Sequence, residues 1–156
     1  MKRIGIFLVA VGLTLCLTGM AMAQTATQVV QFRIDPVNSM TVSGNPPVLA
    51  ISTIPGTAGD GSTSYGVSTN QANRRITGQL DSAMPEYTQL QVSLQAVTGS
   101  TSAGSQILST TPVTLVTGVT RLAESGRSIT YTFNALSGAD EISVTSRTVT
   151  FTITNP

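Results

Sequence analysis

The stretch that decides the fold is residues 147–154, RTVTFTIT, in which every second side chain from Val149 onward is apolar. Val149, Phe151 and Ile153 point to one side of an extended chain, and four threonines point to the other. This period of two predicts a β-strand with one face in the core and one face in water. Such a strand is typical of an antiparallel sheet that is covered on one side only.

Other parts of the chain alternate with the same period. Residues 88–96 and 128–135 each have a clear apolar face, formed by Leu90, Val92, Leu94, Ala96, Ile129, Tyr131, Phe133 and Ala135. Weaker alternation predicts strands at residues 30–34, 40–42, 48–54, 65–67, 76–80 and 113–119. Pieces rich in glycine, proline and serine predict turns at residues 44–47, 55–62, 81–85, 98–105 and 137–140.

This pattern predicts the fold class. About seven to nine short strands separated by turns are typical of an all-β, antiparallel β-sandwich of immunoglobulin-like type. At this level the chain resembles pilin-like and immunoglobulin-like exported domains. The resemblance is one of fold, and a shared fold does not by itself imply an activity.

The N-terminal residues have the pattern of a secretory signal peptide. The basic start Lys2-Arg3 precedes a long apolar run, and Ala21-Met22-Ala23 supplies the small residues of a cleavage site. The run approaches the ~20 residues that span a bilayer, but the small residues favour cleavage after Ala23 over a retained anchor. We therefore predict a signal peptide at residues 1–23 and a single domain at residues 24–156. The domain is expected in the periplasm, on the cell surface or outside the cell, without a membrane span.

Residues 24–156 lack most of the side chains that enzymes use. They contain no His, Cys, Lys or Trp, and their six arginines and seven carboxylates give a formal charge of −1. The usual general base, thiolate nucleophile and Schiff-base amine are therefore missing, as are the nitrogen and sulfur ligands of zinc. So small a charge also argues against nucleic-acid binding. We predict no enzyme, no cofactor, and no catalytic, cofactor-binding or metal-site residue.

Carboxylates are the remaining candidates for chemistry. A pair for glycoside hydrolysis would come from Asp60, Asp81, Glu86, Asp140 and Glu141. Asp60, Asp140 and Glu141 are also the candidates for calcium ligands in loops, although no calcium-loop spacing is present. We favour turn formers or solvated charges for all five, and the sequence leaves open whether the three calcium candidates bind the ion.

Two short features have both a binding and a structural interpretation. Arg74-Arg75 is the only basic doublet of residues 24–156 and suits an anionic polysaccharide or lipid headgroup. We favour the start of a strand, with an arginine stem lying on apolar surface. Tyr65 and Tyr87 suit a sugar-stacking platform, and they suit the ends of core strands equally well.

The surface is expected to consist of hydroxyl and amide groups, with no lysine to protect strand edges. Residues 27–34 are the candidate for an extended N-terminal donor strand that pairs with a neighbour. We predict a non-enzymatic cell-envelope or secreted protein, a structural or adhesive subunit that contacts other envelope or surface proteins or further copies of itself. The alternative is a soluble binding module for a glycan, calcium or another envelope protein.

Overall fold

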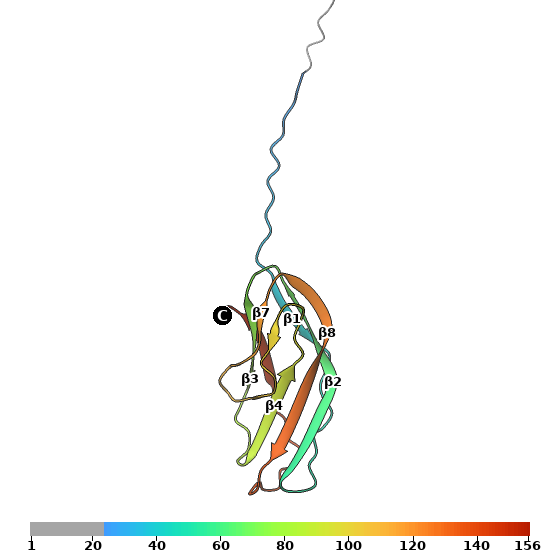
Figure 1. Ribbon diagram of the computed structural model, residues 1–156, viewed down its shortest axis with the longest axis vertical. Helices are drawn as coiled ribbons and strands as arrows, with labels where there is room; N and C mark the ends of the chain where they lie inside the picture. The colour runs from blue at the N-terminus through green and yellow to red at the C-terminus, as the bar shows by residue number, and fades with distance from the viewer. Residues whose placement is uncertain (1–23) are drawn as a thin grey trace, which may run out of the picture. The chain divides into compact units, whose positions relative to one another are not determined.

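The computed structural model describes residues 24–156 (Figure 1). The predicted signal peptide, residues 1–23, lies outside the described residues. Contacts divide the chain after Arg33, so residues 24–33 and the unit Ile34–Pro156 are described separately. Residues 24–33 form no strand or helix, and all of their side chains are exposed. Nowhere in residues 24–156 is there a helix that is long and apolar enough to cross a membrane.

The unit Ile34–Pro156 is β-sandwich-like and consists of two antiparallel sheets (Figure 1). The described residues form nine strands and no helix. One sheet has the order β1-β2-β8-β4-β6, with bounds Asn38–Val42, Gly56–Thr69, Leu122–Ala135, Thr88–Leu94 and Gln106–Ile107. The other has the order β5-β7-β3-β9, with bounds Thr101–Ser102, Val113–Val119, Arg74–Leu80 and Val149–Thr154. The prediction of an all-β, antiparallel fold with seven to nine strands is confirmed.

The two longest strands, β2 and β8, lie side by side in the five-stranded sheet. They pair antiparallel from Gly56 opposite Ala135 to Thr69 opposite Leu122. Their register shifts twice, once after Asp60 and once after Tyr65. Such β-bulges bend a strand and locally increase its twist, so β2 and β8 need not be straight to stay paired along their length.

The core lies between the two sheets. Its buried members are Tyr65, Val67, Ile76, Leu80, Val92, Leu94, Val97, Leu108, Leu115, Val116, Val119, Ile129 and Tyr131. The alternation predicted for β4, β8 and β9 is confirmed, because Val92 and Ile129 are buried while Thr148, Thr150 and Thr152 are exposed.

Two predicted strands are wrong. Residues 30–34 alternate as a strand does, but they form no ladder within the described part of the chain. Val30, Phe32 and Ile34 are 72%, 91% and 84% exposed. Residues 48–54 also form no strand, because the prolines at both of their ends cannot donate a ladder hydrogen bond.

Two predicted turns are wrong as well. Residues 55–62 contain the first half of β2, where Gly56–Asp60 pairs with the end of β8. The ladder with β8 outweighs the low strand propensity of glycine. The predicted turn at residues 98–105 contains the short strand β5, which pairs with β7.

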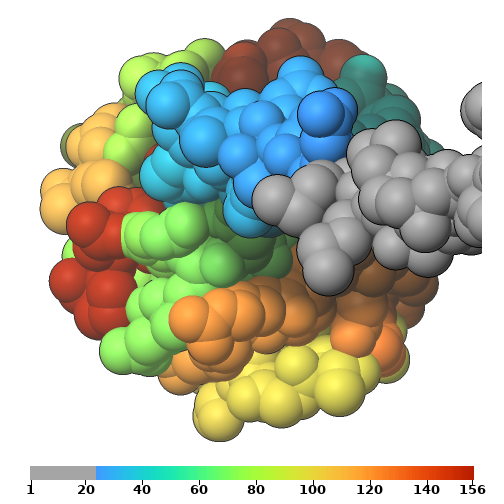
Figure 2. Space-filling view, turned by 90° about the horizontal axis from the view of Figure 1, so that it is seen from above, coloured from blue at the N-terminus to red at the C-terminus, as the bar shows by residue number. Residues whose placement is uncertain are grey.

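Two connections between strands and the C-terminal residues lie at the same end of the unit (Figure 2). The β2–β3 connection, in green, lies between the β7–β8 connection, in orange, and the C-terminal residues, in red. Backbone hydrogen bonds join the two connections, since Arg121 N donates to Gln71 O at 2.9 Å. On the other flank Arg75 pairs with Thr154. This end is therefore well tied together.

Candidate functional site

At the side formed by β1 and β9, the apolar side chains are only partly covered. β1 ends one sheet, β9 ends the other, and the two strands contact each other. The inward side chains Val149, Phe151 and Ile153 of β9 pack against the core but are only half-buried, as is Met40 of β1. On the adjacent strand β3, Ile76 is fully buried. In the sheet, β3 has a neighbour on each side, whereas β9 has one. We call the β1/β9 side the open side.

The opposite side is closed by the chain itself. Residues 97–112 pass through β5 of one sheet and β6 of the other. Val97 and Leu108 lie within the core there and are 2% and 3% exposed. Leu80 N donates to Ser109 O at 2.8 Å, which ties this segment to the end of β3. We call residues 97–112 the closed side.

Asp81 holds the beginning of β9. Thr148 N donates to Asp81 Oδ1 at 3.0 Å, and Asp81 N donates to Thr148 O at 3.0 Å. The hydrogen bond from the Thr148 backbone is the largest cause that holds the pKa of Asp81 below its ordinary value of 3.8. Close to Asp81 in the sequence, the carbonyl oxygen of Ala83 accepts from Arg147 Nε at 2.8 Å. The structure therefore gives this candidate carboxylate a role in positioning the strand of the open side.

Asn70 fixes the direction in which the chain enters β1. Its Nδ2 donates to Asp35 O at 2.8 Å, and its Oδ1 accepts from Val37 N at 2.8 Å. Its own backbone N donates to Val37 O at 3.3 Å. Since Asn38 is paired with Thr69, these bonds extend the β1–β2 ladder by one pair. Residues 35–37 are thus held in line with β1.

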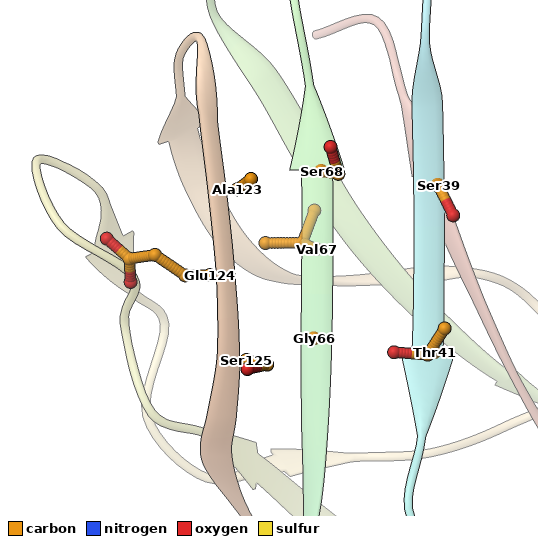
Figure 3. A pocket seen from close by; sticks show the side chains of 8 residues that line it. All are labelled: Ser39, Thr41, Gly66, Val67, Ser68, Ala123, Glu124 and Ser125. Atoms are coloured by element: carbon orange, nitrogen blue, oxygen red, sulfur yellow. The ribbon is translucent and has the colours of Figure 1, made fainter.

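A shallow hollow of about 270 Å³ lies over β1, β2 and β8 (Figure 3). It is lined by Ser39, Thr41, Gly66, Val67, Ser68, Ala123, Glu124 and Ser125. The absence of a side chain at Gly66 helps to make it, because a Cβ there would lie 2.9 Å from Thr41 Oγ1 and 3.2 Å from Ser125 Cβ. Four of the eight lining residues have a hydroxyl group, namely Ser39, Thr41, Ser68 and Ser125.

The carboxylate of Glu124 points away from this hollow (Figure 3). Thr98 N donates to both of its oxygens at 3.2 Å, and Arg127 Nη2 lies 2.6 Å from Oε2. Hydrogen bonds from Thr98, first from its side chain, and the ion pair with Arg127 hold the pKa of Glu124 below its ordinary value. The carboxylate of Glu124 is therefore already bonded to Thr98 and paired with Arg127. The sequence alone does not single out this residue.

The predicted carboxylate candidates are not gathered into one site. Asp60 lies at a bulge of β2, where its Oδ2 accepts from Ser62 N at 3.1 Å and from Ser62 Oγ at 2.9 Å. Asp140 and Glu141 are exposed in the loop between β8 and β9. Across residues 24–156 no three Asp or Glu side chains lie close enough to hold a metal ion. Asp60, Asp140 and Glu141 are therefore not brought together as a calcium site in the described part of the chain.

The arginine doublet begins β3, as predicted for its structural interpretation. Arg74 Nη2 donates to Gln71 Oε1 at 3.2 Å, and both side chains are half-buried. The Nε atoms of Arg74 and Arg75 are buried without a hydrogen-bond partner. The two guanidinium groups therefore do not form an open cationic surface.

The two tyrosines lie in different environments. Tyr65 is 1% exposed, and its hydroxyl donates to Gln95 O at 2.6 Å. Burial raises the pKa of Tyr65 to about 12. Tyr87 is 57% exposed, has a φ of 55° and accepts at its carbonyl from Leu136 N. One is a core residue and the other lies at a strand end, so they form no joint sugar platform.

The open side is the feature that sequence reasoning missed. Alternation identifies the inward face of β9, but it does not show that β9 is the last strand of its sheet. Sheet order follows from long-range pairing and leaves no mark in the residues of one strand. Comparison with known proteins adds no relative: no family model, no curated protein and no solved structure matches this chain.

Proposed function

We propose that the chain is an exported, non-enzymatic protein of the cell envelope or the extracellular space, with an immunoglobulin-like sandwich that serves as a structural or adhesive subunit. The observation that carries the proposal is the open side. Val149, Phe151 and Ile153 line it half-buried beside Met40. Apolar surface left in this state beside an unpaired strand edge is typical of sites that another protein covers.

The remaining surface supports contact rather than catalysis. On the outer face of the four-stranded sheet, Thr150 and Thr152 of β9 are exposed, and Thr77, between Thr152 and Thr114 of β7, is 8% exposed. Hydroxyl groups in such a row hydrogen-bond across strands and form flat surfaces. The hollow over β1, β2 and β8 contains no aromatic side chain and no carboxylate directed into it.

The test is the association of the exported chain, measured by sedimentation velocity and by binding to an envelope fraction. Ile153→Ser introduces a hydroxyl into the open side and is expected to weaken association at least tenfold. Ser125→Ala, on the exposed hollow, is the matched control and is expected to change nothing. Thermal melting verifies that both variants are folded. A chain that is monomeric at every concentration and does not bind the envelope fraction overturns the proposal.

The second candidate is a glycan-binding module, which the hydroxyl-lined hollow favours. Gly66→Ala would place a methyl group against Thr41 Oγ1 and fill its floor. If glycans bind there, this variant loses binding in a titration followed by protein NMR, whereas Ile153→Ser retains it. The two variants thus distinguish binding at the hollow from binding at the open side.

A further inference from the structure

We infer that the open side is a strand-acceptor site and that its occupant is residues 28–34 of a second copy of this chain. The inference rests on the proposed function and names the partner of the open side. It is based on two observations. The outer edge of β9 has no paired strand among the described residues, and residues 28–34 alternate as a strand does but join neither sheet of the described residues.

The acceptor is β9. Its residues 149–154 pair with β3, and no other strand of the described residues pairs with them. The second edge of β9 therefore presents backbone N–H and C=O groups without a ladder partner. Beside this edge, the half-buried Phe151 and Ile153 leave part of the core surface accessible. A strand added here would continue the sheet and cover the core in one step.

The donor is the N-terminal segment. Val30, Phe32 and Ile34 occupy alternate positions, so an extended chain places all three on one face. Phe32 and Ile34 are 91% and 84% exposed. Gln31 and Arg33 lie between them and would face water. The donor residues have the same spacing as Val149, Phe151 and Ile153, so the two strands are matched in period.

The lengths also agree. Seven residues in extended conformation, 28–34, span about 23 Å, and the six residues of β9 span about 20 Å. Pro36 follows two positions after Ile34 and cannot donate a ladder hydrogen bond. The donor strand would therefore end where its apolar alternation ends.

A second copy is favoured over the same chain because of Asn70. Its side chain bonds to Asp35 O and Val37 N and holds residues 35–37 in line with β1. To reach β9 of its own chain, the segment before Asp35 would need a reversal of direction at these residues. Insertion into another copy requires no reversal there and leaves the Asn70 bonds intact.

Strand donation of this kind determines how the copies assemble. Donor and acceptor are different surfaces, so each copy donates to one neighbour and accepts from another. Such head-to-tail contacts give open chains of subunits unless the rotation happens to close a ring. We expect a ladder of dimers, trimers and longer oligomers that grows with concentration, rather than a single dimer.

The first test changes the donor. In the exported chain, Phe32→Ser is expected to weaken association at least tenfold in sedimentation velocity. Gln31→Ser, one position away and on the opposite face, is the matched control and is expected to associate as the unchanged chain does. Phe32 is almost fully exposed, so the variant is expected to fold, and its melting temperature verifies this.

The second test traps the contact. Residues 24–156 contain no cysteine, and replacing Cys16 by Ser removes the one in the chain. One preparation contains Phe32→Cys, and separate preparations contain Val149→Cys, Phe151→Cys or Ile153→Cys. Mixing under air with a copper catalyst, so that oxygen oxidises the two thiols, is expected to give a disulfide-linked pair of chains for at least one acceptor position. Gln31→Cys is expected to give none.

The outcomes separate this inference from the proposed function. Association that survives Phe32→Ser, with no disulfide between the mixed chains, overturns the second-copy inference and leaves contact through another surface in place. A chain with Phe32→Cys and Phe151→Cys that forms its disulfide only internally overturns it too, in favour of the chain's own edge. Absence of any association, with itself or with the envelope fraction, overturns the proposed function as well.

Discussion

The open side and the closed side of the sandwich differ in how the apolar core between the two sheets is covered. On the closed side, residues 97–112 pass through both sheets and bury Leu108 to 3% exposure. On the open side, β1 and β9 end their sheets and contact each other, and Ile153 is half-buried. Both sides are built from strands with apolar inner faces, so the difference lies in the connections.

A sandwich needs a cover for each side at which its two sheets end. Edge strands present unpaired backbone groups as well as apolar side chains. On the closed side, the insertion between β4 and β7 pairs with both strands through β6 and β5, and these two edge strands are only two residues long. The open side has no such insertion, and for this reason we assign it to a contact between molecules.

The largest expected change in the free energy of unfolding comes from shortening one apolar residue on each side. Leu108→Ala is expected to lower the free energy of unfolding by about 2–5 kcal/mol, because it leaves a cavity in a covered part of the core. Ile153→Ala is expected to cost about 1–2 kcal/mol, because water already reaches its side chain. Urea unfolding of both variants measures the two values. Equal losses would contradict the distinction between the sides.

The same pair of regions shows what could be predicted from the sequence. Alternation identified β9 and its inward face correctly, because period two is a property of the strand itself. It failed at residues 30–34, which have the same pattern but no partner strand in the described residues. It also failed at residues 55–62, where pairing with β8 makes a strand of a glycine-rich stretch. The open side depends on sheet order, and local sequence does not encode which strand is last.

The next effect concerns Tyr65, which connects β2 to Gln95, close to the start of the closed side. Its folded-state pKa of about 12 lies above the ordinary 10.0. Its contribution to stability is therefore complete below pH 10 and is lost as the pH rises from 10 to 12, by up to about 3 kcal/mol. Denaturant unfolding across this range measures the loss.

Tyr65→Phe provides the control for that titration. It is expected to cost about 1 kcal/mol at neutral pH, since the hydrogen bond to Gln95 O is lost. It should also flatten the decline between pH 10 and 12. Some decline remains, because burial raises the pKa of Tyr131 as well. A slope as steep as that of the unchanged chain would show that Tyr65 is not the group that titrates.

A smaller effect is expected at Gly78, which lies between the two sides. A Cβ at this position would lie 2.8 Å from Leu115 Cδ1, 3.4 Å from Leu108 Cδ2 and 3.5 Å from Phe151 Cδ1. Gly78→Ala is expected to cost about 1–2 kcal/mol through overpacking, less than a cavity, because the half-buried Phe151 has room to shift. Gly61→Ala is the control, since its Cβ would meet only Thr130 Oγ1 at 3.6 Å. A stabilised Gly78→Ala would mean that the core is looser than described.

The smallest effect concerns the attachment of β9 to Asp81. Because the hydrogen bond from Thr148 N lowers the pKa of Asp81, this contribution to stability is present above the ordinary carboxyl pKa and is lost as the pH falls below it. Asp81→Asn retains an oxygen that accepts from Thr148 N but does not titrate. Its melting temperature is therefore expected to fall less between about pH 5 and pH 2 than that of the unchanged chain. Hydrogen exchange at the amides of residues 149–154 localises the effect, because the carboxylate holds the beginning of the open-side strand. Equal acid sensitivity of the two chains, or a change in exchange on the closed side instead, would mean that Asp81 does not determine how firmly β9 is held.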